Sequence, residues 1–181
     1  MLESETDISS FTNNQVHLED VPQLAVLEYS KLKPAYRNVS LISTTLFFVV
    51  FAAVSFGFRF SDNEIFTEKS VYIFSVLGTL YLLSMLMAYL GFKKKSYALR
   101  ERDIVYNKGL IWQSSTVIPF NRVQHCEISQ GPIERLFGLS ELKIFTAGGS
   151  SSDMSIPGLD PDTANRVKEY IVLKTGNDEE E

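Results

Sequence analysis

The sequence of 181 residues has little of what builds disulfides, metal centres or surfaces for polyanions. It holds one cysteine, Cys126, and two histidines, His17 and His125. A single thiol excludes an intramolecular disulfide and supplies no cluster of metal ligands, so no metal or other cofactor is expected. A single cysteine is also consistent with a protein of a reducing compartment. The charge balance is acidic, with 17 Lys and Arg against 22 Asp and Glu, which argues against a nucleic-acid partner.

The start of the chain lacks the pattern of a signal peptide. The first 38 residues are more acidic than basic, whereas a signal peptide opens with basic residues and passes at once into a short apolar core. The first long apolar run begins only near Val39. We therefore expect residues 1–38 to form a cytoplasmic, partly disordered N-terminal segment.

Charged residues are absent from two long stretches, residues 38–58 and 71–92. At about 1.5 Å of rise per residue, a helix of about 20 residues spans roughly 30 Å, the thickness of a bilayer's hydrocarbon core. A pair of buried core helices is the alternative, but soluble helices of this length usually have a polar face. The sequence predicts two transmembrane helices over 39–58 and 71–92, joined by a short link into an antiparallel hairpin.

Basic residues flank this hairpin on one side. The loop 59–70 holds two bases against three acids, whereas bases dominate just before the first span (Lys31, Lys33, Arg37) and just after the second (Lys93, Lys94, Lys95, Arg100, Arg102). Because positive charge favours the cytoplasmic side, we expect a multi-pass protein of the plasma or inner cell membrane. Its N- and C-termini are both expected to be cytoplasmic.

Beyond Lys95 the pattern becomes that of a β-rich domain. Short stretches of β-branched and aromatic residues alternate with turn residues. The stretches predict strands at 97–100, 104–106, within 110–120, and at 123–130, 142–146 and 154–156, the last closed by Pro157-Gly158. A hairpin turn is expected at 107–109, one helical turn at 133–137 and a flexible turn at 147–153.

The C-terminal part predicts a helix. Asp160 is a suitable N-cap and Pro161 suits the first helical position. Apolar residues recur at helical spacing (Ala164, Val167, Ile171). Gly176 follows them and is expected to end the helix. The acidic tail, 177–181, is expected to be disordered. The fold class is therefore α+β, with six or seven short strands and one helix that closes their core.

Three pieces of this region, VIPFNRVQH, SQGPIERLFGL and IPGL, are specific motifs. On them the chain resembles the bacterial membrane-anchored pleckstrin-homology-like family, the YdbS-like proteins, over about residues 96–173. The two preceding spans match that family's layout. The resemblance implies a pleckstrin-homology (PH)-like β-sandwich or barrel over residues 93–176, built from two nearly orthogonal sheets and a C-terminal capping helix. The acidic first thirty residues lie outside the resemblance.

Basic side chains are the candidate contacts for a partner or a lipid headgroup. Lys93, Lys94 and Lys95 serve first as a topology signal and would also meet anionic headgroups. Arg122 either holds a headgroup or a partner's carboxylate in its planar guanidinium, or fixes a turn by bonding carbonyls or Glu127.

Arg135 is the fifth candidate contact and lies in the segment 131–139. That segment either links two strands by packing Leu136, Phe137 and Leu139 into the core, or docks a neighbouring subunit. Trp112 would serve as a recognition aromatic, a core residue or an anchor at the membrane interface.

No catalytic pattern emerges from the remaining polar residues. His125 and Cys126 are neighbours on a predicted strand, so they point to opposite faces and do not form a pair. His125 is interpreted as a hydrogen-bonded structural residue. The run 148–152 is glycine- and serine-rich, but it lacks the lysine and helix of a phosphate-binding loop and predicts a hairpin tip. We expect no enzyme, and no catalytic, cofactor-binding or metal-binding residue.

The sequence thus predicts a membrane-anchored, non-enzymatic interaction module that presents its domain at the cytoplasmic face. Its partner would be the bilayer together with a membrane protein carrying related domains, or a second copy of the chain. The alternative is a sensor of anionic lipid headgroups. An enzyme acting on lipid or envelope material is the third candidate.

Overall fold

The computed structural model describes residues 27–58, 64–147 and 153–177. The side chains of residues 64–67 and 177 lie outside this description. The expectations for residues 1–26, for the run 148–152 and for most of the acidic tail also fall outside it.

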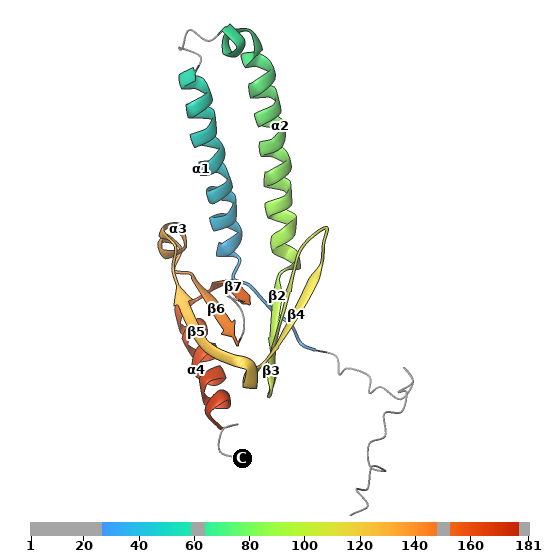
Figure 1. The fold of residues 1–181 in the computed structure, drawn as a ribbon, viewed down its shortest axis with the longest axis vertical. Helices are drawn as coiled ribbons and strands as arrows, with labels where there is room; N and C mark the ends of the chain where they lie inside the picture. Colours follow the sequence, from blue (N-terminus) through green and yellow to red (C-terminus); the bar gives the residue numbers. More distant parts are fainter. Residues whose placement is uncertain (1–26, 59–63, 148–152, 178–181) are drawn as a thin grey trace, which may run out of the picture.

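Two long helices form an antiparallel hairpin that rises from the rest of the molecule (Figure 1). Helix α1 covers Ala35–Phe58 and helix α2 covers Glu64–Lys94. Val39 is the buried residue of α1, and none is buried among the described residues of α2. Large apolar side chains such as Phe47 (59% exposed) and Leu82 (68%) point outward. Both helices are long and apolar enough to cross a membrane. The predicted hairpin of two long apolar helices is therefore confirmed, with both helices extending beyond the uncharged runs.

The first sheet has four antiparallel strands in the order β1-β2-β3-β4. They are β1 (Ser30–Lys31), β2 (Ser96–Leu99), β3 (Asp103–Lys108) and β4 (Ser114–Pro119). Strand β1 precedes the hairpin in sequence and β2 follows it, yet Ser30 pairs with Tyr97 and Lys31 with Ser96. The sheet therefore joins segments from both sides of the hairpin.

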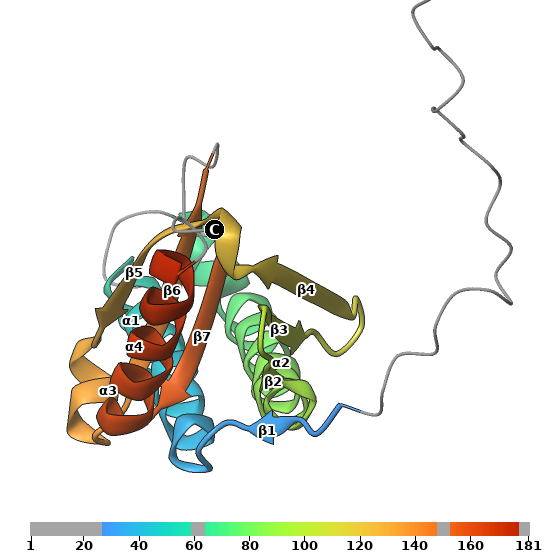
Figure 2. The same cartoon turned by 90° about the horizontal axis from the view of Figure 1, so that it is seen from below.

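The second sheet has three antiparallel strands in the order β5-β6-β7. They are β5 (Val123–Ser129), β6 (Ser140–Thr146) and β7 (Met154–Leu159). The 3₁₀ turn η2 (Phe120–Arg122) leads into β5, and the short helix α3 (Pro132–Leu136) links β5 to β6. The last helix, α4 (Pro161–Asn177), lies against this sheet (Figure 2).

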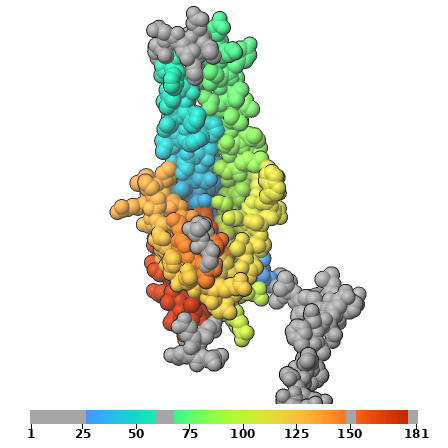
Figure 3. Space-filling view, viewed as in Figure 1, coloured from blue at the N-terminus to red at the C-terminus, as the bar shows by residue number. Residues whose placement is uncertain are grey.

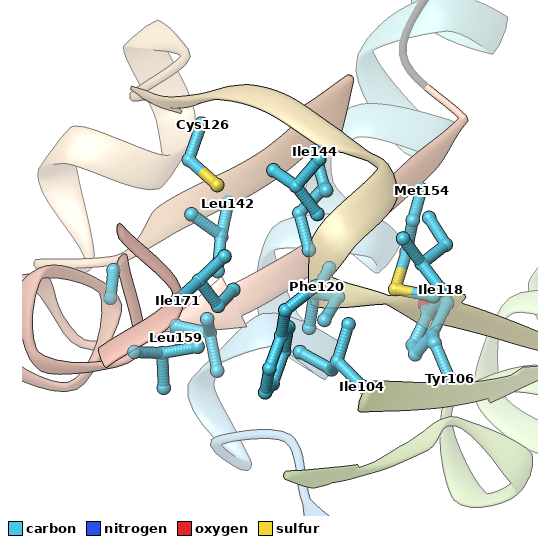
Figure 4. Packing of buried hydrophobic residues seen from close by; sticks show 14 of the residues in the cluster. Ile104, Tyr106, Ile118, Phe120, Cys126, Leu142, Ile144, Met154, Leu159 and Ile171 are labelled. Carbon is cyan, nitrogen blue, oxygen red and sulfur yellow. The ribbon is translucent and has the colours of Figure 1, made fainter. Parts of the chain in front are cut away.

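The core lies between the two sheets and α4 (Figure 4). The stripe predicted for α4 is confirmed, because Ala164 and Ile171 are fully buried and Val167 is 6% exposed. On β5 the expected alternation is also present, with Cys126 buried and His125 exposed. The largest fully buried side chains come from both sheets, η2 and α4 (Phe120, Ile104, Leu142, Ile144, Ile156, Ile171). The predicted α+β architecture, with PH-like sheets and a closing C-terminal helix, is confirmed.

Most local boundaries lie within one or two residues of the predictions, and the clearest differences are at the β3–β4 turn, at β7 and at the end of α4. Residues 110–113 form a loop, so β4 begins only at Ser114, and β3 continues to Lys108. The turn then starts at Gly109, whose φ is +99° and whose place would not admit a Cβ beside the Trp112 carbonyl. Strand β7 runs on through Pro157 to Leu159 because it lies at the edge of its sheet, where a missing N–H is tolerated. Helix α4 passes Gly176 by one residue.

Candidate functional site

The second span enters the domain without a linker. Helix α2 ends at Lys94 and β2 begins at Ser96. The amide of Lys95 between them donates to the Phe92 carbonyl at 3.2 Å. The direction of the span therefore fixes the direction of the first long strand.

The first span is joined to the domain from the other side. Leu32, directly after β1, is 3% exposed and belongs to the core cluster. The Lys33 amide donates to the Gly158 carbonyl at 3.1 Å. Gly158 has φ +69°, and a Cβ built on it would lie 2.6 Å from the Tyr36 Cβ. Tyr36 thus packs directly on the backbone of β7, which only glycine permits at this position.

An aromatic and cationic contact ties the two spans together at their base. The Lys95 Nζ donates to the Tyr36 hydroxyl at 3.2 Å and lies 4.9 Å from the centre of its ring. The Tyr36 and Phe92 rings are 6.5 Å apart. Among the three predicted lysines, Lys95 is half-buried in this contact, whereas Lys93 and Lys94 are exposed. Lys93 lies 4.7 Å from the ring of Tyr89.

An ion pair connects the N-terminal segment to α4. The Lys33 Nζ is 3.2 Å from Asp160 Oδ2, and Asp160 Oδ1 accepts the Thr163 amide at 3.0 Å. The predicted N-cap is therefore confirmed. The Thr163 amide, and to a smaller extent Lys33, hold the pKa of Asp160 below its usual range.

The β3–β4 loop projects beside the base of α2 (Figure 1). Lys94 of α2 lines the same pocket as Lys108, Gly109 and Gln113. The tip of this loop exposes two large apolar side chains, Ile111 at 63% and Trp112 at 86%. The structure therefore rules out a core role for Trp112.

Helix α3 lies beside the base of α1, on the other side of the hairpin (Figures 1 and 3). Its segment 131–134 lines a shared pocket with residues of α1 from Tyr36 to Thr44. Leu139 is buried as predicted, but Leu136 is 84% exposed and Phe137 is 36% exposed. The expectation that these two also pack into the core is therefore wrong, because both are exposed. A helix of five residues has one inner side, and Leu136 lies on the outer one.

Arg122 lies apart from the other predicted contacts. It belongs to η2, which follows the end of β4 that pairs with Asp103, far from the spans. Its side chain is exposed and has no hydrogen-bond or ion-pair partner among the described residues. The structure thus brings Lys93, Lys94 and exposed Arg135 to the membrane-proximal end and leaves Arg122 at the distal end.

An open groove of about 480 Å³ runs between the end of β2 and α4. Strand β1 pairs only with Ser96 and Tyr97, so no strand from the described part of the chain lies beside the outer edge of β2 at Leu99. Leu99 is 38% exposed and Leu173 67%. The groove is lined by apolar and charged side chains (Leu99, Thr163, Arg166, Val167, Glu169, Tyr170, Leu173). The sequence did not predict this groove, because it forms only where α4 and the end of β2 come together.

The chemistry-bearing residues are used structurally. His125 stacks on Phe145 across the β5–β6 pair, with ring centres 4.3 Å apart. Burial raises the pKa of the Cys126 thiol to about 11, so the thiolate is scarce at neutral pH. No group of three or more potential metal ligands occurs among the described residues.

Comparisons with known proteins agree with this architecture. A family model described as bacterial PH domain matches residues 25–174. The transmembrane protein YdbS of Bacillus subtilis (strain 168), of the group UPF0699, is 30% identical over 105 residues, which cover 55% of this chain and 64% of YdbS. The UPF0699 transmembrane protein YdbT of the same strain is 23% identical over 148 residues, covering 81% of this chain and 30% of YdbT.

The chain thus spans less than two thirds of the length of either relative. No solved structure matches it significantly. The family match begins at residue 25, so it includes β1 and the hairpin, which the sequence motifs alone left outside the domain. The chain therefore belongs to the bacterial PH domain family, as a transmembrane member similar to YdbS.

Proposed function

We propose that the chain is a membrane-anchored interaction module whose PH-like domain binds another membrane protein. The observation that carries this proposal is the groove between β2 and α4. It combines exposed Leu99 and Leu173 with the charges of Arg166 and Glu169. Apolar side chains rimmed by charged ones are typical of protein-binding surfaces.

The domain faces the cytoplasm in this proposal. The pairing of β1 with β2 supports an arrangement with both ends of the hairpin on one side of the membrane. The exposed bases Lys31, Lys33, Lys93 and Lys94 gather at those ends. An excess of Lys and Arg near the ends of spans favours the cytoplasmic side.

The partner we propose is a longer membrane protein with related domains. The stretch similar to this chain makes up 30% of YdbT, and YdbT and the shorter YdbS come from the same strain. One genome therefore holds both a short and a long version of this architecture. A second copy of the chain is the other candidate partner.

Substitution in the groove tests the proposal. The tagged full chain is purified in mild detergent from its native membranes, and a co-purifying membrane protein similar to YdbT, or a second copy of the chain, is identified by mass spectrometry. Leu173→Asp places a charge in the groove, whereas Val172→Asp alters a neighbour that is also exposed, at 54%, but does not line it. We expect the first variant to lose its partner and the second to retain it. A strictly monomeric wild-type chain would contradict the proposal, and so would equal loss of the partner from both variants.

A sensor of anionic headgroups is the second candidate, favoured by the exposure of Lys93 and Lys94 beside the spans. Native mass spectrometry of the full chain from nanodiscs would count retained anionic lipids. The double variant Lys93→Gln/Lys94→Gln is compared with Arg102→Gln/Arg122→Gln, which removes two exposed charges from the distal end. Selective loss of anionic lipid in the first variant supports the sensor. Equal retention in both variants rules it out.

A further inference from the structure

We infer that the bilayer itself covers two apolar tips of the domain, one on each side of the hairpin. The first tip is Ile111 and Trp112 in the β3–β4 loop, and the second is Leu136 at the end of α3. Both would insert into the interfacial layer of the membrane. The domain is then held at three places, the hairpin and the two tips, which restricts how it rotates on the membrane.

The register of the first sheet shows how far the first tip reaches along the hairpin. Asn107 pairs with Ser96, which lies two residues after the end of α2. Lys108 pairs with Ser114, and the loop continues beyond this pair toward the spans. Gly109 and Gln113 share a pocket with Lys94. The tip therefore extends alongside the last turn of α2, where the uncharged run 71–92 ends.

The pocket beside α1 gives the depth of the second tip. Residues 131–134 line this pocket together with Val39, Ser40, Ser43 and Thr44 of α1. Thr44 is nine residues into the helix, which is about 13 Å along its axis. The uncharged run begins at residue 38. Helix α3 therefore lies level with the first turns of the lipid-facing span, on the opposite side from the loop (Figure 3).

The charges around the tips suit this environment. Exposed Lys94 and Lys108 flank the first tip, and exposed Arg135 precedes Leu136 in the second. Lysine and arginine near the membrane surface are attracted by anionic headgroups. Tryptophan is enriched at the interface because its ring is apolar while its N–H remains polar. Without a membrane, side chains exposed by 84% and 86% would lie in water.

Trp112 is the only tryptophan of the chain, so its fluorescence reports on the first tip without any substitution. The full chain is reconstituted into vesicles of phosphatidylcholine with a minority of phosphatidylglycerol. Parallel vesicles contain lipids brominated near the top of the acyl chains. We expect an emission blue-shifted from that of tryptophan in water, a loss of fluorescence in the brominated vesicles, and weak quenching by iodide.

The second tip is tested by moving the tryptophan. Trp112→Phe/Leu136→Trp places it on α3, and we expect the same blue shift and loss. The control Trp112→Phe/Gln124→Trp places it at the exposed start of β5, at the distal end. Its emission should stay red and be quenched by iodide.

Two outcomes would overturn the inference. Red, iodide-accessible emission from Trp112 means that the tip lies in water. Blue emission with no loss in brominated vesicles means that protein, such as a second copy of the chain, covers the tip in place of lipid.

Discussion

The two ends of the PH-like domain are built from the same strands but expose different side chains. At the membrane-proximal end the connections between strands expose Ile111, Trp112 and Leu136. At the distal end they expose Arg102 and Arg122. The strands do not require apolar side chains at one end and charged ones at the other. We therefore attribute the contrast to the surroundings of each end. In our proposal, one end meets lipid and the other meets water or a partner.

The ends also differ in how the chain is held together. At the proximal end the segment before α1 and the segment after α2 meet in one sheet, next to Leu32 and Gly158. At the distal end each connection joins neighbours in sequence. We expect substitutions where these two segments meet to cost more unfolding free energy than matched substitutions elsewhere. Each cost is measured by chemical denaturation of the full chain in detergent, followed by circular dichroism.

Leu32→Ala should have the largest effect. Leu32 is 3% exposed in the core, whereas Leu99 at the distal end is 38% exposed. Truncating a buried leucine costs about 2–5 kcal/mol of unfolding free energy. Leu99→Ala, the same change at the other end, should cost about 1 kcal/mol or less. Equal costs would show that the N-terminal segment is not part of the core.

Gly158→Ala should cause the next largest loss of unfolding free energy. Gly158 and Gly138 both have positive φ, +69° and +61°, so alanine is strained at each. Only at Gly158 would the new methyl group meet Tyr36; around Gly138 nothing lies within 4 Å. We expect Gly158→Ala to cost about 1–3 kcal/mol more than Gly138→Ala. Adding Tyr36→Ala should reduce that excess, and an excess unchanged by it would count against the contact.

Two substitutions of Asp160 distinguish its role as a helix cap from its role in an ion pair. Asp160→Ala removes the acceptor for the Thr163 amide and should cost about 1 kcal/mol. Asp160→Asn keeps the cap and loses only the charge facing Lys33, which is worth a few tenths of a kcal/mol between exposed groups.

The pH dependence of this effect follows from the lowered pKa of Asp160. A lowered carboxyl pKa contributes stability that is fully present above the ordinary value of about 4 and is lost as the pH falls through the lowered one. The difference between wild type and Asp160→Asn should therefore shrink on acidification. A difference that grows in acid would contradict the assignment.

Tyr36→Phe should have the smallest effect. It removes the hydroxyl that accepts the Lys95 hydrogen bond but keeps the ring on Gly158. The expected cost is about 0.5–1 kcal/mol, typical of one hydrogen bond that is partly open to water. A cost as large as that of Leu32→Ala would mean that the hydroxyl, not the packing, fixes the spans.

Local patterns in the sequence predicted those elements whose signals lie within one segment. The uncharged runs, the alternation on β5 and the stripe on α4 are such signals, because each reflects one environment along a continuous stretch. The N-cap at Asp160 belongs to the same class.

What the sequence did not reveal depends on distant partners. Ser30 and Lys31 form a strand only because β2 lies beside them, after an insertion of two spans. Leu136 looks like a core residue in sequence, and its exposure follows from how α3 lies along α1. The groove beside Leu99 depends on β1 being too short to cover β2.

The central claim is that segments on both sides of the hairpin form one domain on one side of the membrane. Cysteine cross-linking tests it most directly, in a background where Cys126 is replaced by alanine. Opposite residues of antiparallel strands have Cα atoms about 4.5–5.5 Å apart, within the reach of a disulfide. Lys31→Cys/Ser96→Cys joins such a pair. In Lys31→Cys/Leu99→Cys the second cysteine lies about 10 Å farther along β2.

Oxidation is carried out in native membranes, and linked peptides are detected by mass spectrometry. The account predicts a disulfide within single chains for the 31–96 pair and little for the 31–99 pair. No disulfide in the 31–96 pair, or equal yields from both pairs, would contradict it.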